Sequence, residues 1–551
     1  MQELQIQLAW NRLLAIVEEQ AQVLMRTAFS TVVREAGDLS AGVFNQSGLM
    51  LAQAVTGTPG HVNSMADAVG KFLSKFPLET LHPGDVLVTN DPWDGTGHLN
   101  DFTVVTPVFI VDRCVALFAS TSHIADVGGR GFGPDANDVF EEGIRIPITY
   151  LFRAGQRNDM LMEILTANVR DPKVAEGDLY SLTACNDSGA RQLVEMLDDL
   201  DLPDLEHLGD TILQRSRDAM RAKISALMPG DYHYSMTIDG YQEPVTLQAR
   251  LRVMDESIEV DFSGSSAASP KGINVPLAYT QAYASFGVRC LVGRDIPNNA
   301  GSLEVIKISA PLHSLLNALS PRAVSARHAI GQMLPDVVLG CLHQVLPNAA
   351  PAEGASCIWN PVFMHSLSSD SESEAGQGGD NKFVINPIFN GGTGARAQKD
   401  GLSTTAFPSG VRTTSTEVTE ATSPLVFWCK EYTANSGGEG KYRGGLGQTI
   451  EIAHRYDKEF VISKMFDRVT YPARGRDGGM DGACGRVYVR IKAAGPSQAA
   501  IDVDLPAKGR DMIPAGGRLV LQTPGGGGIG SVRERNPESL AADRKAGLVQ
   551  D

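Results

Sequence analysis

The sequence predicts an α+β protein, a large mixed fold with antiparallel sheets, long helices and a β-rich C-terminal region. Apolar residues recur at the helical period over long stretches, and short β-prone runs alternate with turn signals, among many glycines near the C-terminus. A chain of 551 residues is too long for one small core. We expect an N-terminal α/β region (1–230), a central α+β region (231–370) and a Gly-rich, β-rich C-terminal region (371–551).

The N-terminal segment predicts an amphipathic helix, a hairpin and a second helix. One helical stripe consists of Ile6, Trp10, Leu13, Val17, Ala21, Leu24 and Ala28. Strands at 40–45 and 49–53 flank a Gln-Ser-Gly turn, and a helix is expected at 64–76. His61 lies in the Pro-Gly turn before that helix, where the helix N-terminus attracts negative charge. His61 is therefore a candidate contact to an anionic substrate, with a loop or capping histidine as the alternative.

Later segments predict further helices and strands. Helices are expected at 174–200, 205–228, 277–292 and 326–345. Antiparallel strands are expected within 232–262, and β-prone runs lie at 449–453, 460–464 and 487–491. The run 368–380 is acidic and rich in Ser and Gly, which predicts a surface loop.

Two histidines flank a second predicted hairpin. Strands are expected at 85–89, 102–111 and 115–122. If a short connection at 112–114 closes the hairpin, Thr103 lies opposite His123 and Asp101 lies opposite Ala125. Asp101 and His123 then share a face as diagonal neighbours about 7 to 8 Å apart at the backbone, and His98 precedes the same strand.

These three side chains form a candidate metal site. Two neutral imidazoles and one carboxylate, from His98, His123 and Asp101, suit a divalent transition metal such as Zn, Mn or Fe. The set leaves open positions for water or substrate, as in catalytic sites. The alternative is that both histidines are loop residues bonded to backbone.

Composition and motifs exclude several classes of function. A net charge of -16 and a pI near 5.2 argue against nucleic acid as a partner. Seven scattered cysteines without a Cys-x-x-Cys pair indicate reduced thiols. We find neither a signal peptide nor an apolar stretch of about 20 residues, so we expect a cytoplasmic protein with no membrane partner. Gly440-Lys441-Tyr442 is not a P-loop, and nothing here binds ATP convincingly.

A series of ordered motifs across essentially the whole chain resembles the hydantoinase B family. The motifs are Gly60-His61-Val62-Asn63-Ser64-Met65, Asn90-Asp91-Pro92, Gly97-His98-Leu99-Asn100-Asp101, Ser122-His123-Ile124-Ala125-Asp126-Val127-Gly128-Gly129, Glu142-Gly143-Ile144-Arg145-Ile146-Pro147, Arg327-His328, Asn390-Gly391-Gly392-Thr393-Gly394, Ser436-Gly437-Gly438-Glu439-Gly440 and Thr523-Pro524-Gly525-Gly526-Gly527-Gly528. That family holds B components of ATP-dependent hydantoinases, 5-oxoprolinases and caprolactamases, and related acetone and acetophenone carboxylase subunits.

The resemblance implies a function and a partner. Family members usually work with a kinase-like A subunit, which binds ATP with Mg and phosphorylates a lactam or imide oxygen, or helps to activate bicarbonate. The B component then completes the reaction at its metal. The leading expectation is a hydrolase for small cyclic amides, the B component of an ATP-dependent cyclic amidase. The alternatives are a subunit of an ATP-dependent ketone carboxylase and a noncatalytic scaffold for the A subunit.

The resemblance also implies further site residues. Asp38 would be a fourth metal ligand, with a turn or cap acid as the alternative. Asp126 would orient an imidazole, unless it is a turn residue before two glycines. His328 would act beside Arg327, which could bind a carboxylate or phosphate, or the two would be a structural pair at a helix start. Asn100 stands where the commonest hydrolase pattern has proline, as in some carboxylase relatives.

Overall fold

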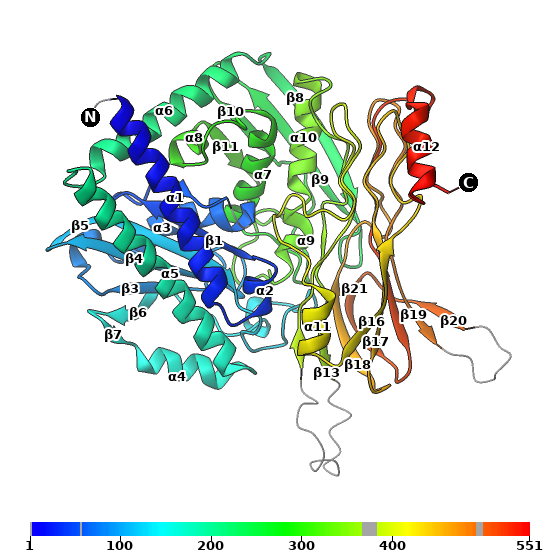
Figure 1. The fold of residues 1–551 in the computed structure, drawn as a ribbon, viewed down its shortest axis with the longest axis horizontal. Coiled ribbons are helices and arrows are strands. Elements are labelled where there is room, and N and C mark those ends of the chain that lie inside the picture. The colour runs from blue at the N-terminus through cyan, green and yellow to red at the C-terminus, as the bar shows by residue number, and fades with distance from the viewer. Residues whose placement is uncertain (1–2, 56–57, 366–382, 492–499, 551) are drawn as a thin grey trace, which may run out of the picture.

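The structure is a computed structural model that describes residues 3–55, 58–365, 383–491 and 500–550. Helices combine with several mostly antiparallel sheets, so the predicted α+β class is confirmed. The N-terminal and central parts of the chain lie side by side, and the glycine-rich C-terminal sheets lie on the other side of the molecule (Figure 1). The expected loop at 368–380 lies outside the described residues. The three-region division stays a prediction.

The N-terminal part is built on a seven-stranded antiparallel sheet in the order β2-β1-β5-β4-β3-β6-β7. Its strands are β1 (Leu39–Phe44), β2 (Met50–Gln53), β3 (Val86–Thr89), β4 (Asp101–Ile110), β5 (Arg113–His123), β6 (Thr149–Arg153) and β7 (Gln156–Arg157). Its helices are α1 (Glu3–Thr27), α2 (Thr31–Arg34), α3 (Pro59–Lys75), α4 (Asp159–Asn168), α5 (Pro172–Asp199) and α6 (Glu206–Ser225).

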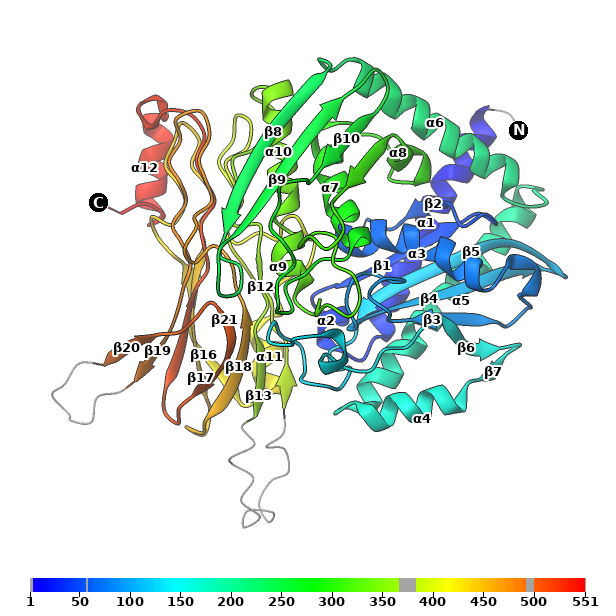
Figure 2. The same ribbon diagram turned by 180° about the vertical axis from the view of Figure 1, so that it is seen from behind.

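Helices cover both faces of this sheet. The helices α1 and α5 pack on one face and α3 packs on the other (Figures 1 and 2). Every residue of β1 and β3 is therefore buried, which explains their nearly continuous apolar sequence. The predicted apolar stripe of α1 faces this interior, where Leu13, Val17 and Leu24 are fully buried.

The hairpin β4–β5 has a different register from the one expected. Asp101 pairs directly with His123, and a β-bulge lies between Val108 and Phe109. The turn contains only two residues, because Ile110 pairs with Arg113. This tight turn shifts the pairing by three positions from the expected register, and the bulge shifts it back by one. The net shift is even, so Asp101 and His123 still share a face, as expected.

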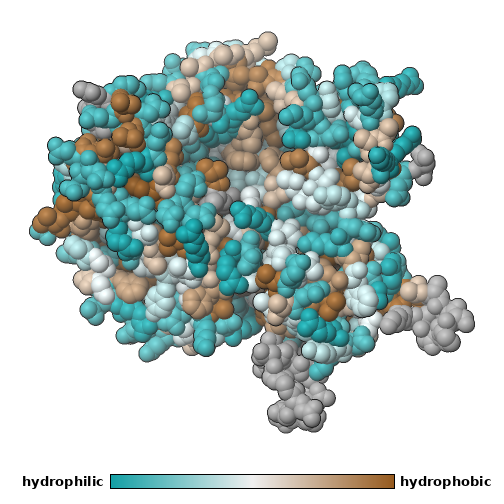
Figure 3. Space-filling model, in the orientation of Figure 1, coloured by the Kyte–Doolittle hydropathy of each residue, from teal (hydrophilic) through white to brown (hydrophobic). Residues whose placement is uncertain are grey.

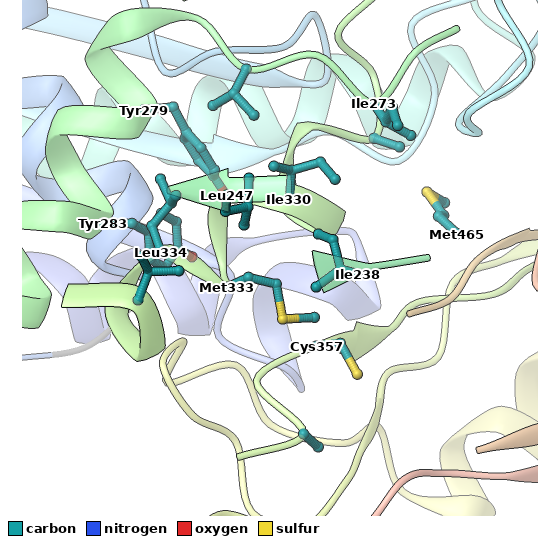
Figure 4. Close-up of a cluster of buried hydrophobic side chains, with 14 of the residues drawn as sticks. Ile238, Leu247, Ile273, Tyr279, Tyr283, Ile330, Met333, Leu334, Cys357 and Met465 are labelled. Carbon is teal, nitrogen blue, oxygen red and sulfur yellow. The ribbon is translucent and has the colours of Figure 1, made fainter. Parts of the chain in front are cut away.

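The central part packs a four-stranded sheet, ordered β11-β10-β9-β8, against helices. Its elements are β8 (Gly230–Ile238), β9 (Val245–Val253), β10 (Ile258–Asp261), β11 (Ile306–Ser309), α7 (Leu277–Leu291), α8 (Ala300–Glu304), α9 (Arg327–Gly331) and α10 (Leu334–Val345). Buried apolar side chains from this sheet, from α7 and α10 and from the C-terminal part meet in one core (Figure 4).

The helix expected at 326–345 is two helices. The break falls after α9, and Pro335 then occupies the first turn of α10. Proline has no backbone N–H to continue the previous helix and suits a first turn. As a result, α9 is a separate short helix at the edge of the candidate site.

The C-terminal part consists of three smaller sheets and two helices. The strands are β12 (Ile358–Trp359), β13 (Val362–His365), β14 (Val384–Ile385), β15 (Phe389–Asn390), β16 (Leu425–Tyr432), β17 (Gln448–His454), β18 (Phe460–Met465), β19 (Arg486–Ile491), β20 (Ile501–Asp504), β21 (Lys508–Ile513) and β22 (Arg518–Gln522). The helices are α11 (Thr416–Thr422) and α12 (Pro537–Lys545).

The glycine motifs of this part let chain segments lie backbone to backbone. A Cβ atom on Gly392 would lie 1.9 Å from the carbonyl oxygen of Gly445, and one on Gly525 would lie 1.8 Å from that of Ser436. Any other residue would collide with backbone at these positions. Close packing therefore explains these glycines, and no nucleotide-binding role is needed to explain them.

The exterior shows no broad apolar face in the orientation of Figure 3, where hydrophobic residues are scattered among hydrophilic ones. Among the described residues, no helix combines the length and apolar character that crossing a membrane requires. All seven cysteines are free.

Candidate metal centre

The ends of β4 and β5 bring together the three residues that the sequence selected. Asp101 begins β4, His123 ends β5, and His98 lies in the loop just before β4. Each residue offers a ligand atom, and these atoms lie within 4.8 Å of one another. All three side chains are buried, with 0% to 3% exposure.

The hydrogen bonds of His98 leave room for a cation. Its Nδ1 lies 2.9 Å from the carbonyl oxygen of Ser325, so Nδ1–H must be the donor. Its Nε2 lies 2.7 Å from Oδ1 of Asp101. Burial, reinforced by the charge of Arg327, lowers the pKa of His98 to about 3, which opposes a second proton. A lone pair and a carboxylate at this distance repel unless a positive ion lies between them.

Asp101 is held in place by its own chain. Oδ2 accepts a hydrogen bond from Thr96 Oγ1 at 2.8 Å and one from Nη2 of Arg327. Burial alone would raise the pKa of Asp101, but its neighbours, above all His61, hold it well below its usual range. The carboxylate is therefore ionised. Gly97 permits the close approach of Arg327, whose Cδ would lie 2.6 Å from an added Cβ.

His61 approaches the same carboxylate from the other side. It lies in the first turn of α3, which begins at Pro59, earlier than expected. Nε2 of His61 lies 2.9 Å from Oδ2 of Asp101, and Nδ1 lies 3.5 Å from Oδ1 of Asp38. Burial lowers the pKa of His61, but the two carboxylates outweigh it and raise the pKa above its usual value.

Asp38 lies next to the candidate ligands. It precedes β1, and its carbonyl oxygen accepts a hydrogen bond from the backbone N–H of His123. Oδ1 of Asp38, Nδ1 of His61 and Nε2 of His123 are buried and accept or donate no hydrogen bond among the described residues. A bound ion or substrate would supply the missing partner.

These groups line a small cavity of about 20 Å³, enough for one water-sized group or ion. Phe132 packs on His98, His123 and His328, with ring centroids 5.0 to 5.6 Å apart. The Arg327 guanidinium stacks 3.9 Å above the ring of Tyr279. Burial keeps the pKa of His328 well below its usual value, so this imidazole is neutral.

The expectation for Asp126 is corrected. Its carboxylate accepts a hydrogen bond from the N–H of Gly128 at 3.1 Å and forms an ion pair with Arg170 at 2.5 Å, and no hydrogen bond joins it to an imidazole in the described chain. Gly128 has a φ of +81°, so the local turn recruits the acid. The turn alternative for Asp126 is the one that the structure favours.

Several residues of the site gave no clear signal in the sequence. Thr96, Phe132 and Tyr279 come from separate segments, as do Gln332 and Asn360, which also line the cavity. Only Gln332 carries a positional clue, because it lies four residues after His328 and thus one helical turn away. The others meet through tertiary packing, and no local pattern reveals them.

Comparison with known proteins agrees with the architecture. The family model described as "Hydantoinase B/oxoprolinase" matches residues 2–532. A protein from a Pseudomonas species, named as the B component of a D-/L-hydantoinase, is 27% identical over 567 residues, which covers 99% of this chain and 92% of that protein.

Two solved structures share the fold. The ATP-dependent caprolactamase from Pseudomonas jessenii has a TM-score of 0.88 at 22% identity, covering 100% of this chain and 95% of that chain. A nucleotide-free structure of acetone carboxylase has a TM-score of 0.87 at 18% identity, with 100% and 78% coverage. The family match extends over nearly the whole sequence, and the predicted resemblance is confirmed. The chain belongs to the hydantoinase B/oxoprolinase family.

Proposed function

We propose that this chain is the metal-dependent component of an ATP-dependent enzyme that opens small cyclic amides, such as hydantoins, 5-oxoproline or lactams. The observation that carries the proposal is the convergence of His98, Asp101 and His123, whose ligand atoms are buried and lie within 4.8 Å of one another. Membership of the hydantoinase B/oxoprolinase family supports the substrate class.

The residues present fit a divalent transition metal such as Zn, Mn or Fe. His98, Asp101 and His123 would hold it, and the unpartnered Oδ1 of Asp38 would be the fourth ligand. The fit rests on donor chemistry, since imidazole and carboxylate ligands suit these metals. When bound, such an ion lowers the pKa of water towards about 7 and polarises a carbonyl group.

Two other histidines take different roles in this proposal. His61 has a raised pKa and a hydrogen bond from Nε2 to Asp101, so its protonated form carries a proton at Nδ1, which faces Oδ1 of Asp38 at 3.5 Å. That proton would go to the ring nitrogen as it leaves the carbonyl carbon. His328 is neutral and would orient the substrate through a hydrogen bond at Nε2.

The ATP-dependent step needs a second protein in this scheme. The sequence contains no convincing nucleotide-binding motif, and we propose a kinase-like A subunit as the partner that binds ATP and Mg. That subunit would phosphorylate the amide oxygen, which turns a poor electrophile into a good one. We expect the assembly to be cytoplasmic.

The reaction is tested by purifying the chain together with a kinase-like A subunit of a hydantoinase or oxoprolinase. We expect ATP-dependent opening of a hydantoin or lactam ring, measured by chromatography of the product, and no opening without ATP. Bicarbonate-dependent carboxylation of a ketone without ring opening would contradict the proposal and support the carboxylase alternative.

The metal site is tested by elemental analysis of variants. His98→Ala and His123→Ala should each lose stoichiometric metal, whereas His82→Ala should retain it, because the His82 side chain is 72% exposed and lies outside the cavity. Stoichiometric metal in both cavity variants would overturn the assignment. Full ring opening after removal of both histidines would support the scaffold alternative.

Asn100 does not decide between the proposed function and the carboxylase alternative. Asn100 stands where the commonest hydrolase pattern has proline. Its Nδ2 donates a hydrogen bond to the carbonyl oxygen of Ile124 at 2.9 Å, so it ties the loop before β4 to the segment after β5. Because this side chain is bound to backbone and does not line the cavity, it supports the site geometry in either reaction.

A further inference from the structure

Two amide side chains in the candidate metal cavity have oxygen atoms without a partner. Gln332 caps the C-terminus of α9 and is 1% exposed, and Asn360 follows β12 and is 6% exposed. Oε1 of Gln332 and Oδ1 of Asn360 accept no hydrogen bond among the described residues. Burying an acceptor without a donor costs free energy, so both oxygens call for a donor from a ligand.

Both amides belong to residues outside the candidate ligand set. Gln332 lies one turn after His328, and its backbone N–H donates to the carbonyl oxygen of His328. Phe132 stacks on His328 and packs on His98 and His123. The lining of the cavity therefore combines imidazole and carboxylate groups with the neutral side chains of Gln332 and Asn360.

The shape of the cavity limits what these oxygens can contact. Its volume is about 20 Å³, so in this conformation it holds one water-sized group, and its lining must widen to take the edge of a ring beside a bound ion. Among the described residues that line the cavity, all except Asp38 are buried, and 14% of the Asp38 side chain is exposed. A substrate would enter past Asp38 with its reacting bond foremost.

A neutral amide oxygen accepts a hydrogen bond from an N–H or O–H donor. A divalent transition metal prefers imidazole and carboxylate ligands, which leaves the two amide oxygens to pair with an N–H group of the substrate. In a cyclic amide the N–H nitrogen is bonded to the carbonyl carbon that reacts. A cyclic ketone carries CH2 at that position and leaves the acceptor unpaired.

We propose that Gln332 and Asn360 recognise the ring N–H of the intact cyclic amide, before its oxygen is phosphorylated, and so select cyclic amides over ketones. The proposal rests on the proposed function of the same cavity. By holding the ring nitrogen, the two amides place the adjacent carbonyl towards His98, Asp101 and His123.

The test uses two rings of nearly equal shape. The metal-loaded full-length chain is titrated calorimetrically with 2-pyrrolidinone, which has a ring N–H, and with cyclopentanone, which has CH2 instead. We expect the wild type to bind 2-pyrrolidinone about tenfold more tightly, the value of one hydrogen bond to a neutral group. Gln332→Met and Asn360→Leu should each reduce the preference at least threefold.

Matched controls separate recognition from folding. Oε1 of Gln53 is also buried without a partner but lies outside the cavity, so Gln53→Leu makes the same chemical change elsewhere and should keep the wild-type preference. Thermal unfolding and metal content, measured for each variant, show that the cavity variants are folded and loaded. Equal wild-type affinity for the two rings, no binding of either, or an unchanged preference in both cavity variants would overturn the proposal.

The experiments distinguish failure of this recognition proposal from failure of the proposed function. A preference for 2-pyrrolidinone that Gln332→Met abolishes, in a complex that opens no ring with ATP, would leave recognition standing and refute the reaction. Ring opening by a complex whose variants keep the full preference would refute recognition alone.

Discussion

Two buried ionic clusters in this chain differ in the kind of atom that each leaves without a partner. Around Asp101 the unpartnered atoms include Nε2 of His123 and Oδ1 of Asp38, which can offer lone pairs to a cation. Around Glu353 they include guanidinium nitrogens of Arg468 and Arg476, which have none to offer. Buried charge alone therefore does not mark a metal site, and the identity of the unsatisfied atoms does.

The Glu353 cluster has complete pairing on its acidic side. Oε2 of Glu353 lies 3.1 Å from Nη1 of Arg468, and Oε1 lies 2.6 Å from Nη2 of Arg474. The hydroxyl of Tyr234 also donates to Oε1 at 2.8 Å. These contacts join β8 to the segments before β12 and after β18, so the cluster holds the central and C-terminal parts together.

The largest effect should follow from removing the charge at the centre of the first cluster. Asp101→Asn should reduce bound metal to background and ring opening by more than about a thousandfold. It should also lower the free energy of unfolding by about 3 to 5 kcal/mol, because Arg327 stays buried without its carboxylate. Elemental analysis, product assays and denaturant unfolding measure the three effects. A folded Asp101→Asn variant with stoichiometric metal would contradict the assignment of the metal to the Asp101 cluster.

The corresponding change in the second cluster should affect stability alone. Glu353→Gln removes the carboxylate 3.1 Å from Arg468 and leaves Asp336, at 3.7 Å, as the remaining acid beside it, so the free energy of unfolding should fall by about 3 kcal/mol. Metal content per folded molecule should stay at the wild-type level, as elemental analysis after size exclusion would show. Loss of metal from Glu353→Gln would contradict this prediction, because it would mean that the Glu353 cluster also affects metal binding at the Asp101 cluster.

Binding of the metal should stabilise the protein through the first cluster only. At a free metal concentration of 100 times Kd, the free energy of unfolding should rise by about 2.7 kcal/mol, and a chelator should reverse the rise. Glu353→Gln should show the same increment and Asp101→Asn none. Denaturant unfolding with and without metal measures it, and an equal increment in Asp101→Asn would place the ion elsewhere.

The support of His98 should make the stability of the protein depend on pH. Oε1 of Glu142 accepts hydrogen bonds from the N–H groups of Val324 and Ser325, and burial raises the pKa of this carboxyl to about 8. The unfolded chain releases the proton near 4.5, so folding takes up a proton between these values. Stability should therefore fall as pH rises through this window, by at most about 1.4 kcal/mol per unit.

Glu142→Gln is the matched variant for this pH dependence. Glutamine keeps the accepting oxygen and cannot ionise, so its free energy of unfolding should change less steeply between pH 5 and 8, as urea unfolding at several pH values would show. An identical slope in the variant would assign the dependence to other groups, such as Asp467, whose pKa burial raises to about 7.

The sequence predicted the fold class and the meeting of His98, Asp101 and His123, because strand alternation and motif order are local signals. It missed the register of the hairpin, since neither the two-residue turn nor the bulge follows from residue type. For Asp126 the sequence left two roles open, because a turn acid and an acid that supports a ligand look alike in sequence. The partners of Asp101 from α9 are more than 200 positions away in sequence, and only packing brings them together.

The bulge between Val108 and Phe109 links the reactive end of the hairpin to its distant tip. Seven residues of strand, about 23 Å, separate it from Asp101. If the bulge were lost with no residue removed, Val115 would pair with Val108, Ser122 would lie opposite that aspartate, and His123 would turn to the other side of the sheet. Deleting Val115 itself would instead remove the bulge and keep Asp101 opposite His123, so the bulge can absorb the loss of one residue at this tip.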